Sequence, residues 1–104
     1  MKLKRYEILL PLNYNDGTEI EQEKFDLTNQ ELLDRFGAVT FDSIIASGHW
    51  LYKGVLYKDQ LFRFRIDAED TEEVRDFFFK FKNVLKERFQ QLDIWITAYN
   101  IEII

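Results

Sequence analysis

The sequence predicts an α+β protein with a ferredoxin-like fold, in which two helices cover one face of a four-stranded antiparallel sheet. Three observations lead to this expectation. Stretches of β-favouring residues occur near both ends and in the middle of the chain, one segment has strong helical periodicity, and a glycine-containing turn signal divides the middle stretch. The resulting order of elements is βαββαβ, the split βαβ arrangement. With 104 residues, a single domain covering residues 1–104 is expected.

The first strand and the first helix are predicted from turn and capping signals. Residues 4–12 are apolar and β-favouring, and a cluster of turn residues follows them. We expect residues 13–27 to form an irregular connection with room for one helical turn. Thr28 and Glu31 then have the spacing of a capping box, and Gly37 supplies a stop signal, so a short helix is predicted between them.

The middle of the chain is predicted to form a long β-hairpin. Residues 39–52 and 55–67 are rich in β-favouring residues, and Lys53-Gly54 lies between them as a two-residue turn. With that turn, Trp50 lies opposite Tyr57, and Ile45 lies opposite Phe62.

The clearest helix is predicted at residues 71–91. Asp70 is positioned to cap it, with Glu73 at the third position, and apolar residues recur at three- and four-residue spacing. Phe79 lies off this stripe and is expected to be partly exposed. The core-facing stripe consists of Val74, Phe77, Phe78, Phe81, Leu85, Phe89 and Leu92.

The last strand is predicted at residues 93–104, where Ile94 and Ile96 alternate with Trp95 and Thr97. Asn100 is a candidate β-bulge in this strand.

One face of the sheet is expected to remain uncovered by helices. Phe62, Phe64 and Ile66 share one side of the third strand, and only this all-apolar side is suited to pack against helices. The other side is an amphipathic patch large enough to mark a subunit interface or a ligand surface. Its hairpin residues are Ile44, Ala46, Trp50, Tyr52, Val55, Tyr57, Leu61, Arg63 and Arg65.

Composition excludes several classes of function. Residues 16–35 hold seven acidic and two basic residues, which accounts for the net charge of −5, and no basic stripe for nucleic acid is present. A solvated acidic surface is favoured over an acidic docking site for this segment. The chain has no cysteine, hence no disulfide, thiolate nucleophile or zinc-finger site. With no nucleotide-binding motif and no span-length apolar run, we expect a cytoplasmic protein without cofactor, metal, nucleic acid or membrane partner.

His49 is the only histidine and hence the only side chain whose ordinary pKa lies near neutrality. It is a candidate general base that Asp59 would orient across the hairpin. The alternative, which we favour, is a strand residue that packs and forms local hydrogen bonds.

The aromatic and arginine residues of the hairpin have two interpretations each. Trp50, Tyr52 and Tyr57 are suited to stack on a planar ligand, but a cross-strand ladder or a dimer contact is the favoured role. Arg63 and Arg65 are suited to bind an anionic ligand, but ion pairs with neighbouring strands or with a partner chain are favoured.

The sequence resembles a group of short bacterial proteins of unknown function. The resemblance is carried by Arg35-Phe36-Gly37-Ala38-Val39-Thr40, by Gly48-His49-Trp50, by Gly54-Val55-Leu56-Tyr57-Lys58-Asp59 and by Arg88-Phe89-Gln90-Gln91. It implies an α+β sandwich and implies no activity. From the residues themselves we expect a non-enzymatic homo-oligomer that uses the uncovered sheet face for contact with itself or a protein partner. The alternative is a small cofactor-free enzyme or ligand binder with a pocket between two paired sheets, in which His49, Tyr57 and Arg63 act on a small anionic or aromatic molecule.

Overall fold

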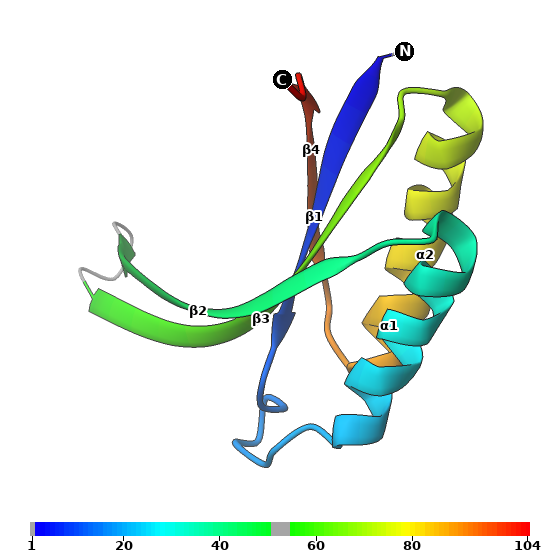
Figure 1. Ribbon diagram of the computed structural model, residues 1–104. Coiled ribbons are helices and arrows are strands. Elements are labelled where there is room, and N and C mark those ends of the chain that lie inside the picture. The colour runs from blue at the N-terminus through cyan, green and yellow to red at the C-terminus, as the bar shows by residue number, and fades with distance from the viewer. Residues whose placement is uncertain (1, 51–54) are drawn as a thin grey trace.

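Within the part of the chain that the structure describes, four antiparallel strands form one sheet and two helices lie against one of its faces (Figure 1). The structure is a computed structural model that describes residues 2–50 and 55–104, and the side chains of residues 46–59 lie outside that description. The strand order across the sheet is β2-β3-β1-β4, which confirms the predicted ferredoxin-like α+β fold. The elements are β1 (Leu3–Pro11), α1 (Gln22–Phe36), β2 (Thr40–Trp50), β3 (Val55–Glu69), α2 (Glu72–Arg88) and β4 (Trp95–Ile101).

The hydrophobic core lies between the helices and the two central strands. Phe64 and Ile66 of β3 are at most 1% exposed, and Phe62 packs against this core, so the predicted helix-facing side of β3 is confirmed. Alternate residues of β1 face the same way, because successive side chains of a strand point to opposite faces. The buried core residues of β1, α1 and α2 are Tyr6, Ile8, Leu10, Phe25, Leu32, Phe78, Phe81 and Leu85.

Helix α1 begins at Gln22, six residues before the predicted capping residue Thr28. Thr28 is fully buried in the middle of the helix, and its hydroxyl donates a hydrogen bond to the carbonyl of Lys24 at 2.7 Å. A threonine hydroxyl that bonds back one turn is compatible with a helix interior, so the capping-box spacing was misleading here. The predicted end is confirmed, since Gly37 has φ 78° and its N–H bonds to the carbonyl of Leu33.

Helix α2 is capped by Thr71, and the prediction of Asp70 as the cap was wrong. The Thr71 hydroxyl accepts a hydrogen bond from the N–H of Val74 at 3.2 Å, in the usual cap geometry. The helix ends at Arg88, so Leu92 lies beyond it and is 93% exposed, although it was assigned to the core stripe. Phe79 is 59% exposed, as expected.

The register of the hairpin differs from the predicted one by two residues. Trp50 lies opposite Val55 and Ile45 opposite Gln60, so four residues separate the paired strands instead of the two-residue loop Lys53-Gly54. That turn lies in residues 51–54, outside the described part of the chain. At the other end of the sheet, Asn100 pairs regularly with Lys4, so the predicted bulge is not formed.

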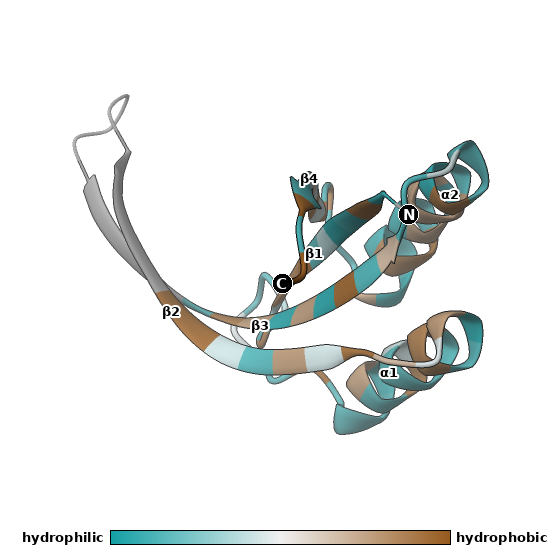
Figure 2. Cartoon of the chain, turned by 45° about the horizontal axis from the view of Figure 1, so that its top comes forward, coloured by the Kyte–Doolittle hydropathy of each residue, from teal (hydrophilic) through white to brown (hydrophobic). Residues whose placement is uncertain are grey.

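The hairpin of β2 and β3 extends well past the rest of the sheet (Figure 1). Strand β1 pairs with β3 only as far as Leu61, whereas the pairing of β2 with β3 continues to Trp50 and Val55. We call the paired segments 45–50 and 55–60 the ribbon. Figure 2 shows hydrophilic and hydrophobic residues alternating along β3 nearer the helices. Among the described residues, no helix combines the length and apolar character that a membrane span requires.

Candidate functional site

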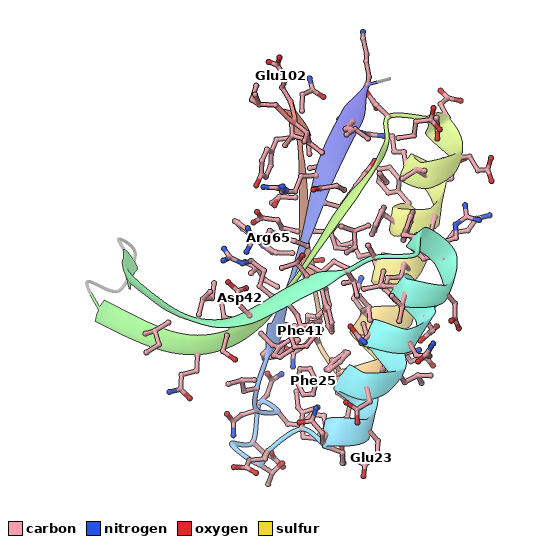
Figure 3. All side chains as sticks on the ribbon, in the orientation of Figure 1. Glu23, Phe25, Phe41, Asp42, Arg65 and Glu102 are labelled. Atoms are coloured by element: carbon pink, nitrogen blue, oxygen red, sulfur yellow. The ribbon has the colours of Figure 1, made fainter. Side chains whose placement is uncertain are left out.

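The face of the sheet that points away from the helices, here called the open face, is the candidate site. All four strands contribute alternate residues to it, and Figure 3 shows Asp42 and Arg65 on this side and Phe25 on the helix side. Its described residues away from the ribbon include Leu3, Arg5, Glu7, Leu9, Asp42, Ile44, Leu61, Arg63, Arg65, Asp67, Trp95, Thr97 and Tyr99.

An arginine–aspartate pair between β2 and β3 lies near the middle of this face. The guanidinium of Arg63 donates two hydrogen bonds to Asp42, at 2.9 and 2.7 Å, because the register places the two residues directly opposite each other. Arg65 lies 3.6 Å from the same carboxylate. The Arg63 guanidinium therefore holds the pKa of Asp42 below its usual range, against the opposing effect of desolvation.

A second pair joins β1 to β3. Arg5 donates hydrogen bonds to Asp67 at 2.7 and 2.9 Å, and these bonds lower the pKa of the aspartate and raise that of the arginine. On β4, the Tyr99 hydroxyl donates to Glu7 at 2.6 Å. Most charges of the open face thus pair with one another across neighbouring strands. Between them lie apolar and aromatic side chains, of which Trp95 is 66% exposed.

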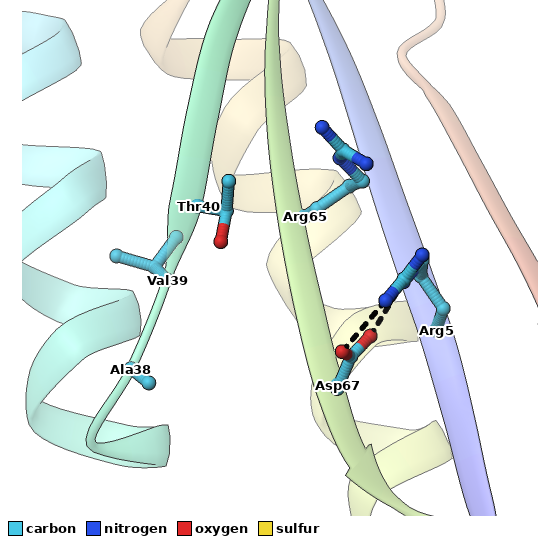
Figure 4. Close-up of a pocket in the computed structure, with 6 residues that line it drawn as sticks. All are labelled: Arg5, Ala38, Val39, Thr40, Arg65 and Asp67. Atoms are coloured by element: carbon cyan, nitrogen blue, oxygen red, sulfur yellow. Dashed lines mark hydrogen bonds and ion pairs between the residues drawn. The ribbon is translucent and has the colours of Figure 1, made fainter. Parts of the chain in front are cut away.

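A small pocket of about 120 Å³ opens on this face beside the start of β2 (Figure 4). Arg5, Arg65 and Asp67 lie on one side of it, and Ala38, Val39 and Thr40, which follow α1 in the chain, lie on the other. The Nε of Arg65 is buried and has no hydrogen-bond partner among the described groups. The Arg65 side chain as a whole is 31% exposed, so its guanidinium is accessible to a ligand or to another chain. The pocket is lined by Arg5, Ala38, Val39, Thr40, Arg65 and Asp67.

The structure brings three of the predicted site residues together. Leu61, Arg63 and Arg65 lie on the open face at successive outward positions of β3. Tyr52 lies outside the described residues, and for His49, Trp50 and Tyr57 only the backbone is described. The roles proposed for those four side chains therefore stay predictions.

The proposed pairing of His49 with Asp59 is not favoured by the strand register. His49 lies opposite Leu56, whereas Asp59 lies opposite Ala46, three residues further along the ribbon. Three residues of a strand span about 10 Å, so the register separates the two positions that the two-residue turn would have made neighbours.

Sequence reasoning missed the partners of the arginines and the whole contribution of β1 and β4. Asp42, Arg5, Asp67 and Tyr99 were not identified, although each lies at an outward position of a predicted strand. The missing information was the sheet register, because only the correct pairing shows that Arg63 lies opposite Asp42 and that Arg5 lies opposite Asp67. Among the described side chains, no cluster of three or more potential ligands for a metal ion occurs.

Solved structures of similar shape show the same fold. A phage SAM lyase in complex with S-methyl-5'-thioadenosine is 16% identical, with a TM-score of 0.67 and with 97% of this chain and 90% of that chain covered. The periplasmic divalent cation tolerance protein CutA from Archaeoglobus fulgidus is 16% identical, with a TM-score of 0.62 and coverages of 97% and 85%. The fold is shared. GlnK from B. subtilis, in complex with ATP, is 17% identical, with a TM-score of 0.57 and coverages of 96% and 82%.

At these identities the likeness shows the fold alone. No protein-family model matches the chain, and no curated protein matches it either. The resemblance to short bacterial proteins through the motifs around Arg35, Gly48 and Gly54 therefore stays a prediction, as does the cytoplasmic location.

Proposed function

We propose that this chain is a non-enzymatic, self-associating ferredoxin-like protein, in which the open face and the ribbon form the contact between copies. The observation that carries the proposal is the ribbon, whose two strands pair only with each other from Ile45 and Gln60 onward. An isolated two-stranded hairpin is at best marginally stable in water, so a ribbon of this length is expected to pack against something.

The shape of the chain supports this proposal. Its radius of gyration is 14.8 Å, whereas a compact domain of this length has about 13 Å. The difference reflects the ribbon, which projects away from the helices (Figure 1). Because a second copy carries an identical ribbon and an identical open face, one symmetric contact would support both ribbons at once.

The chemistry of the open face also favours a protein partner. Interfaces are enriched in aromatic residues and arginine, and charges buried within them are paired. Trp95 and Tyr99 supply exposed aromatic rings, and Arg63 is already paired with Asp42. Covering this face would therefore bury apolar area with few unpaired charges.

Light scattering of Leu61→Glu tests the proposal. Leu61 lies on the open face where the ribbon begins, and a carboxylate there would have to lose its hydration on assembly. We expect the wild type to be oligomeric at micromolar concentration and Leu61→Glu to be shifted to monomer. Leu92→Glu is the matched control, because Leu92 is exposed and lies in the connection between α2 and β4, outside the four strands. A wild-type monomer at high concentration, or equal effects of both variants, would contradict the proposal.

A second candidate function is the binding of a small anionic or aromatic molecule, by a ligand binder or a cofactor-free enzyme, between two paired sheets. The open-face pocket, which is lined by Arg5 and Arg65, favours it. Two of the similar structures are complexes with adenosine compounds, S-methyl-5'-thioadenosine and ATP. The pocket of about 120 Å³ is smaller than the roughly 300–1,000 Å³ of ordinary ligand sites, so a second copy has to supply its remaining walls.

Calorimetric titration with S-methyl-5'-thioadenosine and with ATP tests this second function. We expect saturable binding of at least one compound by the wild type, and loss of binding in Arg65→Ala. Arg35→Ala is the control, because Arg35 is a surface arginine at the end of α1. Absence of binding by the wild type, or equal losses in the two variants, would exclude these compounds at this pocket.

A further inference from the structure

A groove of about 300 Å³ lies on the helix side of the sheet, between α2 and β4, and is separate from the open face. This volume reaches the lower limit of ordinary small-molecule sites. Its floor and walls come from three elements, with Tyr6 on β1, Ile96 and Ala98 on β4, and four residues of α2. Those four residues are Arg75, Phe78, Phe79 and Lys82.

The groove exists because β4 has a small residue at a position where a larger side chain would fill the space between β4 and α2. Ala98 lies at a helix-facing position, opposite Tyr6 on β1, and is exposed. The ring of Phe79 is also 59% exposed beside the groove. Both α2 and β4 therefore expose apolar surface to the groove, and such surface is suited to bind an aromatic ring.

The hydroxyl of Tyr6 is the buried polar group of this groove. Tyr6 is 3% exposed, its ring stacks on Phe78 at 4.0 Å, and its hydroxyl has no hydrogen-bond partner among the described groups. Burial raises the pKa of Tyr6, so the hydroxyl stays protonated at neutral pH and can donate. A buried hydroxyl without a partner is costly, and an acceptor placed in the groove would remove that cost.

Two basic side chains line the groove, and they differ in their existing partners. Lys82 pairs with Asp93 at 3.0 Å. Arg75 lies over the ring of Phe79 at 5.2 Å and forms no ion pair with a described carboxylate. Arg75 and Tyr6 line the same groove, and the charge of Arg75 lowers the pKa of Tyr6 whereas that of Asp70 raises it. The nearby Asp70 is itself paired with Lys4 at 3.6 Å.

We infer that this groove binds a small aromatic carboxylate, with its ring against Phe79 and Ala98 and its carboxylate between the Tyr6 hydroxyl and the Arg75 guanidinium. The apolar walls accommodate the ring. The hydroxyl and the guanidinium supply a neutral donor and a charged donor to the same anion. The site is independent of self-association, because none of its residues lies on the open face.

Phenylacetate is the probe, and phenylacetamide is its neutral counterpart of the same shape. Amide chemical-shift changes in a ¹H–¹⁵N correlation spectrum report both the affinity and the location of binding. We expect saturable shifts around Phe79, Lys82, Ile96 and Ala98 with phenylacetate, and affinity about tenfold or more lower for the amide, because hydrogen bonds to charged groups are the stronger ones.

Variants identify the contribution of each part of the groove. Arg75→Gln is expected to weaken phenylacetate binding about tenfold, whereas Lys80→Gln, which removes the same charge from α2 outside the groove, leaves it unchanged. Ala98→Leu fills the groove and is expected to abolish binding. Tyr6→Phe is expected to weaken binding without lowering the stability of the free protein, a combination that a purely structural hydroxyl would not give.

Three results would overturn the inference. These are equal affinity for phenylacetate and phenylacetamide, equal effects of Arg75→Gln and Lys80→Gln, and shifts that fail to saturate or that fall on the open face. Because Arg75→Gln changes a side chain at the helix surface, the comparison holds even where Ala98→Leu disturbs folding.

Discussion

Thr28 is a polar residue that joins the two helices through hydrogen bonds. Its hydroxyl donates to the carbonyl of Lys24 and accepts a hydrogen bond from the guanidinium of Arg88 at 2.8 Å. Arg88 also pairs with Glu31, and its side chain is 14% exposed. A hydroxyl that is fully buried between α1 and α2 thus holds a largely buried arginine, and the two helices are tied to each other at this point.

Replacement of Thr28 by valine is expected to lower the free energy of unfolding by about 1–3 kcal/mol, because a buried donor of Arg88 loses its acceptor while the shape of the side chain is kept. Denaturant unfolding measures the change. Thr28→Ser keeps the hydroxyl and loses only a methyl group, and it should cost less than the valine variant. If serine costs as much as valine, packing and not the hydrogen bond explains the role of Thr28.

At the same scale, the sequence identified the arginines of the candidate site but not what they bind. Arg63 and Arg65 could be placed on the uncovered side from strand alternation alone. Asp42 lies on another strand, and its pairing with Arg63 depends on the hairpin register. An interaction between residues far apart in the sequence cannot be predicted from the alternation of residues within one strand, since that alternation indicates only which face of the sheet a residue occupies.

Among the elements, α2 shows how closely a cap can be predicted. The acidic residues and the helical periodicity identified the N-terminus to within one residue, but both Asp70 and Thr71 are common capping residues. In the structure, Thr71 has extended backbone angles and accepts from Val74, while Asp70 pairs with Lys4 on β1. Local propensity does not decide between Asp70 and Thr71 as the cap, and in the structure Asp70 instead contacts β1.

Thr71→Ala is expected to lower the free energy of unfolding by about 1 kcal/mol, because the N–H of Val74 loses its acceptor at the start of α2. Thermal or urea unfolding measures it. Thr71→Ser should restore most of the stability, since serine caps equally well. Asp70→Ala is the control at the residue that sequence reasoning favoured, and a larger loss there than in Thr71→Ala would contradict this assignment of the cap.

The hairpin register and the start of α1 were less accessible to prediction, for different reasons. A shift of two residues leaves every side chain of β2 and β3 on the same face, so the apolar pattern fits both registers equally well. In α1, the buried stripe of Phe25, Thr28 and Leu32 contains a threonine, and the apolar periodicity is correspondingly weak before Leu32. Both errors left the fold unchanged, because the faces of the elements were correct.

For the whole molecule, the main feature is the contrast between a compact body and a projecting ribbon. The body has helices on one face of the sheet and buries helix-facing apolar residues of both central strands. The ribbon has no third strand alongside it in the described chain. Segments with few buried contacts open locally at low free-energy cost, so the two parts should differ in backbone protection.

Hydrogen exchange is therefore expected to be fast in the ribbon of a dilute or monomeric sample and slow in the pairs between β1 and β3. Protection of residues 45–50 and 55–60 should increase with protein concentration in the wild type, because assembly covers them. In Leu61→Glu the ribbon should exchange rapidly at every concentration. Mass spectrometry of peptides from these segments makes the measurement, and strong protection in a monomeric variant would show that the ribbon is stable alone.

A register shift of two residues leaves every side chain on the same face of the sheet, and this property affects how the ribbon can change in length. Removing one residue from each strand next to the loop shortens the hairpin by one pair, or about 3.4 Å, and leaves the orientation of every retained side chain unaltered. Deleting a single residue from one strand alone would instead move the side chains of that strand beyond the deletion to the opposite face. Related proteins can therefore have ribbons of different length on the same body, provided that each insertion or deletion in one strand is matched by one in the other strand.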